Sequence, residues 1–296
     1  MLLGATSALG PFNSLASLGA TIACVARPGA KINRLVESAK STAATLLLPT
    51  KDVNGEEKVG ADMLADAPAL AQWIISLDPT KQIVIGCYAY LDGEAHVRAS
   101  VAMDLIASTV YAARKDTALA YLVSPATSHA ASPASMDASM KRFNSGPMWH
   151  GLFSPIGSFA PNYAPKNANG IHVVNGLSGV QGPNYALAKM SQQWRAMVAK
   201  SEGVIVSACH APAARTESMV SYATIAAALE GVQSFEPVVS FDADTASALM
   251  CGILLWDIND EKSAANPRNK DEHPVLLLVE NACHGGVRAR AKRAYA

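Results

Sequence analysis

Short apolar runs alternate with helical patterns along almost the whole chain, and this alternation restricts the fold more than any other feature. A run such as residues 82–87 (QIVIGC) is apolar throughout, so it needs cover on both faces. Strands of this kind, joined through helices, form parallel sheets with helices on both sides. The sequence therefore predicts an α/β fold with a parallel sheet of about seven strands, formed by one domain over residues 1–296.

The individual elements follow from apolar periodicity and from helix start and stop signals. Asp66 is predicted to cap the helix that follows it. The predicted strands are residues 1–3, 21–26, 45–48, 82–87, 119–123, 204–209 and 275–279, with a further candidate at 171–175. The predicted helices are residues 11–18, 31–40, 66–77, 95–114, 185–200, 216–230 and 242–256.

One segment, residues 125–170, breaks this rhythm. It is rich in Ser, Pro, Asn and Gly, and it carries several Met and aromatic residues. Loops longer than about 15 residues are uncommon within compact domains and often serve as lids or binding segments. The sequence therefore predicts an insertion or lid here, whose apolar residues contact a substrate or form a small core of their own.

Charge and hydropathy exclude several classes of partner. The chain has 24 basic and 24 acidic residues, so its net charge does not predict binding to nucleic acid. No apolar run reaches the about 18 residues of a membrane span. The first residues lack a signal-peptide pattern, and no targeting leader is visible. The first strand is either short or has lost a leader.

Five scattered cysteines, Cys24, Cys87, Cys209, Cys251 and Cys283, lie within apolar stretches. An odd number of widely spaced thiols is typical of reduced core cysteines rather than of a disulfide framework. We therefore expect a reducing intracellular compartment, the cytoplasm or an organelle interior. No Cys-x-x-Cys spacing occurs, and we expect no metal site.

The pair Tyr185 and Lys189 carries the clearest chemistry. Their spacing of four residues places both side chains on one face of a helix. A nearby ammonium is expected to lower the pKa of the phenol from its ordinary value of about 10. Such a tyrosine can exchange a proton with a carbonyl or an alcohol near neutral pH.

A glycine turn from Gly4 to Gly10 follows the first strand and leads into the first helix. In this context a glycine turn is typical of a site for the pyrophosphate of a dinucleotide. The turn and the Tyr-Lys pair together indicate hydride transfer.

These features resemble the short-chain dehydrogenase/reductase superfamily over most of the chain. The turn is similar to the family's Thr-Gly-x-x-x-Gly-x-Gly motif, with Ala8 at the middle glycine, and Tyr185 and Lys189 match its Tyr-x-x-x-Lys motif. The resemblance implies a Rossmann-type doubly wound sheet, with an insertion before the helix of the catalytic Tyr185. It implies that Lys189 also holds the nicotinamide ribose, and that the turn contacts the cofactor through Gly4, Thr6, Ser7, Leu9 and Gly10.

Other positions resemble the family's cofactor contacts. Arg27 directly follows the second strand, where a cation can pair with the 2′-phosphate of NADP(H). Asp62 and Met63 resemble the family's adenine-contacting pair, although a surface Asp near a helix explains Asp62 nearly as well. Pro212 and Thr216 resemble the Pro-Gly-x-x-x-Thr turn beside the nicotinamide, with Ala213 in place of the Gly.

The catalytic serine has two candidates. The family commonly places it about thirteen residues before the Tyr, where this chain has His172. Ser178 lies in a passage, NGLSGVQGPNYALAK, that reads much like the family's, whereas Ser124 ends the strand that follows the fourth helix. Local sequence favours Ser178 and chain order favours Ser124; we prefer Ser178 slightly.

Two departures from the family weaken the case for turnover. Its Asn-Asn-Ala-Gly motif is Gly86-Cys87-Tyr88-Ala89 here, and its helical Asn has no clear match, Ser100 being nearest. We therefore expect an NADP(H)-dependent oxidoreductase that interconverts a carbonyl and an alcohol on a largely apolar substrate. The alternative is a catalytically eroded member that acts as a structural or regulatory subunit of a larger complex. A sugar-nucleotide epimerase is less favoured, and a homo-oligomer or a larger assembly is expected.

Overall fold

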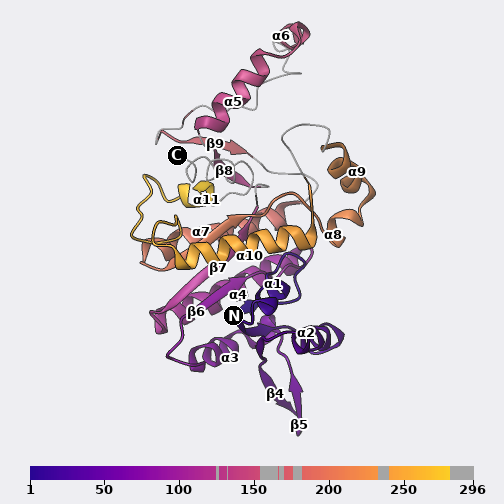
Figure 1. The fold of residues 1–296 in the computed structure, drawn as a ribbon, viewed down its shortest axis with the longest axis vertical. Helices are drawn as coiled ribbons and strands as arrows, with labels where there is room; N and C mark the ends of the chain where they lie inside the picture. Colours follow the sequence, from indigo (N-terminus) through magenta and orange to yellow (C-terminus); the bar gives the residue numbers. More distant parts are fainter. Residues whose placement is uncertain are drawn as a thin grey trace.

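The computed structural model describes residues 1–124, 127–131, 133–153, 166, 170–175, 182–232 and 240–280. In this part of the chain, six parallel strands form a central sheet in the order β10-β7-β6-β1-β2-β3 (Figure 1). The strands are β1 (Leu2–Leu3), β2 (Thr21–Val25), β3 (Thr45–Leu47), β6 (Ile83–Cys87), β7 (Thr117–Val123) and β10 (Ile205–His210). The α/β fold and the parallel, Rossmann-like sheet are confirmed.

The strand order reverses at β1, because β2 lies on one side of it and β6 on the other. In sheets of this kind, ligands bind beyond the carboxyl ends of the strands near such a reversal. The residues that follow β1 and β6 are therefore the expected place for a ligand in this fold.

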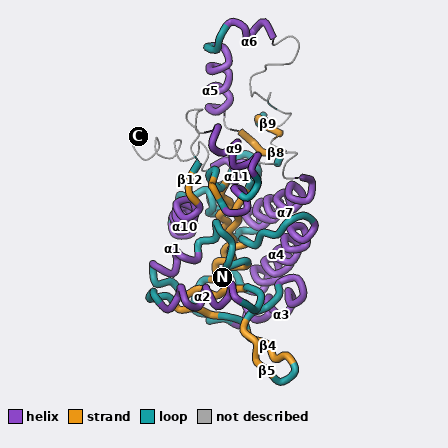
Figure 2. Tube along the Cα trace, turned by 90° about the vertical axis from the view of Figure 1, so that its right-hand side faces the viewer, coloured by secondary structure: helices purple, strands orange, loops and turns teal. Residues whose placement is uncertain are grey.

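Helices cover both faces of the sheet (Figure 2). On one face lie α3 (Met63–Ser76), α4 (Glu94–Ala113) and α7 (Gly182–Ser201). On the other lie α1 (Phe12–Ser17), α2 (Ala30–Lys40) and α10 (Ala243–Asn259). Both helical layers bury apolar side chains against the strands.

The strands supply both layers because successive side chains point to opposite faces. In β1, Leu3 packs toward α3 and α4, whereas Leu2 packs toward α1 and α10. In β7, Leu119 and Tyr121 join the first layer, and Ala120 joins the second. Strands buried on both sides therefore read as continuous apolar runs.

The seventh strand predicted at residues 275–279 is wrong. These residues belong to helix α11 (Leu276–Glu280), which buries Leu277 and Leu278 in the core. A short apolar run has no periodicity that separates a buried strand from a buried helix. The helix predicted at 216–230 is divided into α8 (Glu217–Val220) and α9 (Ala223–Val232), and the short strands β11 (Ala214–Arg215) and β12 (Phe241–Asp242) pair beside it.

Part of the predicted insertion has structure of its own. Strand β8 (Ser128–Ala131) pairs antiparallel with β9 (His172–Asn175), so the strand candidate at 171–175 does not join the central sheet. Helices α5 (Pro133–Asn144) and α6 (Met148–Phe153) extend away from the main body (Figure 1). Met136 is buried, but Met148 is 95% exposed, so the apolar residues of this segment do not form a single core.

A second difference lies near the start of α3. Residues 50–59, which lie between the predicted elements, form an antiparallel hairpin of β4 (Thr50–Val53) and β5 (Glu56–Val59). The cap of α3 is Asp62, whose Oδ1 accepts a hydrogen bond from the Leu64 amide at 2.9 Å. Asp66, the predicted cap, lies inside the helix, where it accepts from the Asp62 amide and pairs with Lys51.

Candidate active site

The predicted site residues gather along one edge of the sheet. Gly4 follows β1, Arg27 follows β2, Ser124 follows β7 and Pro212 follows β10. Because all four strands are parallel, their carboxyl ends meet at the same edge. The sequence motifs, which are separated by more than 200 residues, therefore come together in space.

The glycine turn after β1 requires its first glycine. Gly4 has a φ of +89°, and a Cβ at this position would lie 2.4 Å from the Ala89 Cα atom. The Gly4 carbonyl accepts from the Ser7 amide, and the Ser7 carbonyl accepts from the Gly10 amide, both at 3.0 Å. Gly4 thus lets the loop after β6 approach the turn closely.

The turn retains free hydrogen-bond donors. Within the described residues, the amides of Thr6, Ala8 and Leu9 donate to no protein acceptor. Backbone amides exposed in a tight turn form a concave site suited to an anion. The Ser247 hydroxyl holds the far end of the turn by donating to the Gly10 carbonyl at 2.8 Å. The turn therefore fits a pyrophosphate.

Arg27 and Asp62 lie near each other beside the end of β2. Arg27 is exposed, and the Ala61 amide donates to the carbonyl of its neighbour Ala26 at 3.0 Å. The contact brings the start of α3 next to Arg27. Asp62 uses one carboxylate oxygen to cap α3, and Met63 is buried in the core. Arg27 is free to meet a phosphate, whereas these two residues have structural roles.

Tyr185 and Lys189 lie on α7 above the ends of β7 and β10. The Lys189 Nζ atom is 5.8 Å from the centre of the Tyr185 ring, which confirms that they share a helical face. The Ser124 hydroxyl hydrogen-bonds the Tyr185 phenol. Ser124, Tyr185 and Lys189 therefore form one cluster, which favours Ser124 over Ser178; Ser178 lies outside the described residues.

The ionisation of this cluster differs from the sequence-based expectation. Burial raises the pKa of Tyr185, and its hydrogen bond with Ser124 only partly opposes this rise. Burial also lowers the pKa of Lys189 to about 8. Both groups thus lean toward their neutral forms, because withdrawal from water disfavours either charge.

Lys189 is held by partners that the sequence analysis missed. Its Nζ donates to the Leu122 carbonyl at 3.0 Å and to Gln192 Oε1 at 3.2 Å. The Gln192 Nε2 atom in turn donates to the Ser100 hydroxyl at 3.2 Å. Gln192 lies one helical turn after Lys189, a spacing that could have identified it. Ser100 was noted only as standing near the family's helical Asn.

A parallel set of contacts positions Ser124. The neighbouring Gln193 donates to the Ser124 carbonyl at 3.2 Å and to the Thr127 hydroxyl at 3.0 Å. The Thr127 hydroxyl also donates to the Ser124 carbonyl at 3.2 Å. All three residues are buried, so the backbone that carries the Ser124 hydroxyl is fixed.

Aromatic rings surround Tyr185 on another side. The His96 ring stacks on Tyr185 with centres 5.7 Å apart, and Tyr90 meets both rings at 4.9 and 6.2 Å. Neither residue was selected from the sequence, because each stands alone in an apolar or loop segment. Pro212 and Thr216 are buried beyond the end of β10, at the same edge.

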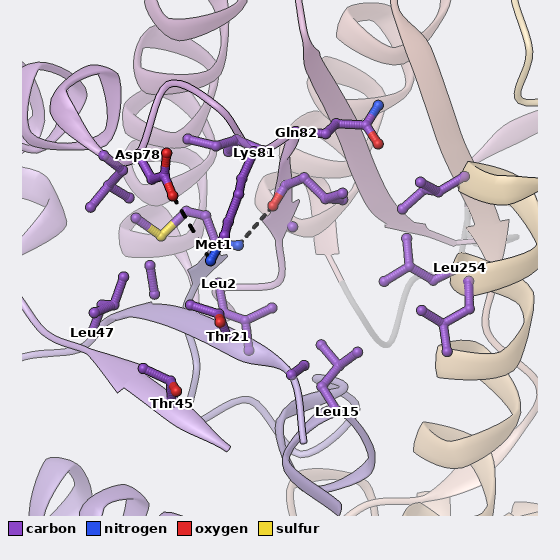
Figure 3. A pocket seen from close by; sticks show the side chains of 18 of the residues that line it. Met1, Leu2, Leu15, Thr21, Thr45, Leu47, Asp78, Lys81, Gln82 and Leu254 are labelled. Carbon is purple, nitrogen blue, oxygen red and sulfur yellow. Dashed lines mark hydrogen bonds and ion pairs between the residues drawn. The ribbon is translucent and has the colours of Figure 1, made fainter. Parts of the chain in front are cut away.

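A separate cavity lies at the opposite edge of the sheet, at the amino ends of the strands (Figure 3). It measures about 470 Å³ and is lined by apolar side chains that include Leu2, Leu15, Leu47 and Leu254. Beside it, β2 and β6 extend further toward this edge than Leu2, which pairs with Cys24 and Gly86. The Met1 amino group closes one side by donating to the Val84 carbonyl. This cavity is remote from Tyr185.

The described residues add two findings about partners and thiols. Among their helices, none combines the length and the apolar character that a bilayer crossing requires. Cys24, Cys87 and Cys251 are buried free thiols.

Comparison of the chain with models of protein families and with curated proteins gave no match.

Proposed function

We propose that the protein is an NADP(H)-dependent oxidoreductase of the short-chain type, which interconverts a carbonyl and an alcohol on a largely apolar substrate. The observation that carries this proposal is the cluster of Ser124, Tyr185 and Lys189 at the same edge of the sheet as the Gly4 turn. A proton donor, a hydroxyl and a cation beside an anion-binding turn are the groups that carbonyl reduction needs.

The cofactor would lie along the carboxyl edge of the sheet. The free amides of the Gly4–Gly10 turn would hold its pyrophosphate, Arg27 its 2′-phosphate and Lys189 its nicotinamide ribose. When bound, NADP(H) would supply or accept the hydride. The fit is supported by the free amides and by the exposed Arg27, whereas Asp62 and Met63 contribute less because they are already used in α3.

The protein's own residues would handle the proton. In carbonyl reduction, the Tyr185 hydroxyl would give its proton to the substrate oxygen while the Ser124 hydroxyl donates a hydrogen bond to the same oxygen. Lys189 is charged below its pKa of about 8, and its Nζ atom lies 5.8 Å from the centre of the Tyr185 ring, so it would stabilise the resulting phenolate. The raised pKa of Tyr185 keeps the phenol protonated and ready to act as an acid.

The test compares cofactor binding with turnover in two matched variants. Tyr185→Phe should abolish NADPH oxidation with a panel of apolar ketones, yet leave the NADPH affinity, measured by fluorescence titration, nearly unchanged. Tyr111→Phe is the control, since Tyr111 bonds Glu202 and Arg195 away from the cluster. Full turnover by Tyr185→Phe would refute the assigned role, and failure of the wild type to bind NADPH would refute the cofactor.

The alternative, an eroded member acting as a subunit of a larger complex, is favoured by one observation. The hydrogen bonds of the Lys189 ammonium already go to the Leu122 carbonyl and to Gln192, rather than to Tyr185. NADPH binding without oxidation by any carbonyl of the panel would support this alternative.

A second copy of the chain is the partner that we propose. An apolar stripe crosses the exposed side of α4 and α7 and consists of Val101, Leu105, Leu187, Met190, Trp194 and Val198, each at least 39% exposed. Two packed helices of about 30 Å offer a face of about 600 Å² per copy, or about 1,200 Å² in a pair, which reaches the lower limit of stable interfaces. A two-fold axis requires only this one surface.

A further inference from the structure

His96 occupies the first turn of α4 and is enclosed by the candidate site. It is 1% exposed, and its ring forms a three-ring cluster with those of Tyr90 and Tyr185, in which each ring contacts the other two. The planes of His96 and Tyr185 differ by 24° with their centres 5.7 Å apart, an offset stack. The imidazole is thus a direct neighbour of the phenol that we propose as the proton donor.

One nitrogen of this ring has a partner and the other has none. Nδ1 lies 3.5 Å from the Leu91 amide and accepts from it, so in the neutral ring the proton resides on Nε2. Within the described residues, Nε2 is buried and has no hydrogen-bond partner. Burial and the nearby Lys189 lower the pKa of His96 to about 4, so the ring is neutral at physiological pH.

A purely structural role does not account for this arrangement. A buried donor without an acceptor destabilises the fold, and an apolar side chain of similar size would avoid that cost. A histidine that served the core alone would be expected to have both nitrogens paired. The free N–H therefore indicates a donor kept for a ligand.

We propose that the His96 Nε2–H group binds a second oxygen of the substrate, next to the carbonyl that Tyr185 protonates. The preferred substrates are then carbonyl compounds with a neighbouring oxygen acceptor, such as β-keto esters, rather than simple ketones. This inference rests on the proposed function and adds the substrate class to it. A site built to pair with a polar group discriminates strongly against analogues that lack the group.

Because Nε2 is buried, a neighbouring group has to move before a substrate oxygen can reach it. Tyr90 is 45% exposed and lies in the loop after β6, where its hydroxyl bonds Asp92 at 3.1 Å. Tyr185 is held by Ser124 and by α7. Rotation of Tyr90 is the less costly way to bring a substrate oxygen to His96.

The test removes the second substrate oxygen and the His96 donor, separately and together, and compares the effects on kcat/KM. The wild type and two variants are assayed for kcat/KM with ethyl 3-oxobutanoate and with the matched ketone 2-hexanone. His96→Leu removes the donor, and His96→Gln keeps an N–H near the position of Nε2. We expect His96→Leu to lower kcat/KM for the keto ester by about tenfold or more, to leave the ketone nearly unchanged, and His96→Gln to restore part of the loss.

Other outcomes overturn the inference. An equal loss on both substrates would indicate a structural role, as would a lower thermal midpoint for His96→Leu than for wild type. The ¹⁵N and ¹H shifts of the Nε2–H group provide a readout that does not depend on turnover. They should move when the keto ester is added to the protein with NADP⁺, and unchanged shifts contradict the inference. Absence of NADPH binding by the wild type would instead contradict the proposed function.

Discussion

At the scale of single residues, the site depends on buried polar groups whose partners lie far away in the sequence. Gln192 reaches Ser100 across 92 positions, and Gln193 reaches Ser124 across 69. Such bonds fix side chains because a broken bond would leave a buried polar atom unpaired. Gln192 also accepts a hydrogen bond from the buried Lys189 ammonium, so it is one of the groups that affect the pKa of Lys189.

The first prediction concerns Gln192. Replacing it by Glu would place a carboxylate at the Lys189 ammonium and raise the pKa of Lys189 above about 8, whereas Gln192→Leu would lower it further. Titration of the lysine side chain by ¹⁵N NMR measures both shifts. Equal pKa values in the two variants would show that Gln192 does not control Lys189.

The lowered pKa of Lys189 in the wild-type protein also affects stability. The pKa of Lys189 falls from 10.5 to about 8 on folding, so between these values the unfolded chain binds more protons. The contribution of Lys189 to the unfolding free energy should therefore rise with pH through this window, by about 1–3 kcal/mol, whereas the buried thiols of Cys24 and Cys87, whose pKa values are raised, contribute in the opposite direction. Urea unfolding of the wild type and of Lys189→Met at pH 7.5 and 10.5 isolates the part due to Lys189. The difference between the two proteins should change by this amount, and a constant difference would contradict the prediction.

A third prediction concerns the turn. Gly4→Ala should cost about 3 kcal/mol or more, because strain at positive φ is joined by a clash with the Ala89 backbone. Gly93→Ala is the control without a clash: its φ is +58° and no atom lies within 4 Å, so backbone strain alone should contribute and the loss should be smaller than for Gly4→Ala. Thermal denaturation of both variants measures the difference, and equal losses would rule out the clash.

At the scale of elements, local signals located the central strands but not every boundary. The apolar runs at 21–26 and 82–87 form β2 and β6, as expected for strands that are buried on both faces. The run at 275–279 is equally apolar and yet forms a helix, because a short apolar run is compatible with either element and its tertiary surroundings decide between them. The proximity of Tyr185 and Lys189, in contrast, could be predicted from sequence, because both residues lie on one helix and their spacing alone sets the distance between them.

The cap of α3 provides a prediction at this scale. Asp62→Ala should lower the unfolding free energy by about 1 kcal/mol, because the Leu64 amide loses its acceptor. Asp66→Asn, which weakens the exposed ion pair with Lys51, should cost less, about 0.5 kcal/mol. Denaturant titration of both variants compares them, and a larger loss for Asp66→Asn would favour the cap predicted from sequence.

At the scale of the whole molecule, the sheet brings five separate loops to one edge and leaves one helical face uncovered. The contacts of His96 with Tyr185 and of Gln192 with Ser100 could not be predicted from sequence, because they depend on how α4 and α7 pack against each other. The same packing creates the exposed apolar stripe, which no single helix displays. Contacts of this kind exist only in the assembled fold.

The stripe gives the last prediction. Trp194→Glu should convert a dimer to a monomer in light scattering, because it places a charge within the proposed interface. Tyr222→Glu is the control, since Tyr222 is also 60% exposed but lies outside α4 and α7. A wild type that is already monomeric, or a dimeric Trp194→Glu, would refute the interface.

The two-residue strand β1 has a further consequence. Met1 and Leu2 line the cavity at one edge of the sheet, and Gly4 begins the turn at the other, so only Leu3 separates Leu2 from the turn. In the neighbouring strands β6 and β7, five and seven residues separate the amino end from the carboxyl end. A bulkier side chain in the cavity, for instance at Ala23 beside Leu2, should therefore displace the Gly4–Gly10 turn, and faster amide exchange in that turn would report the displacement.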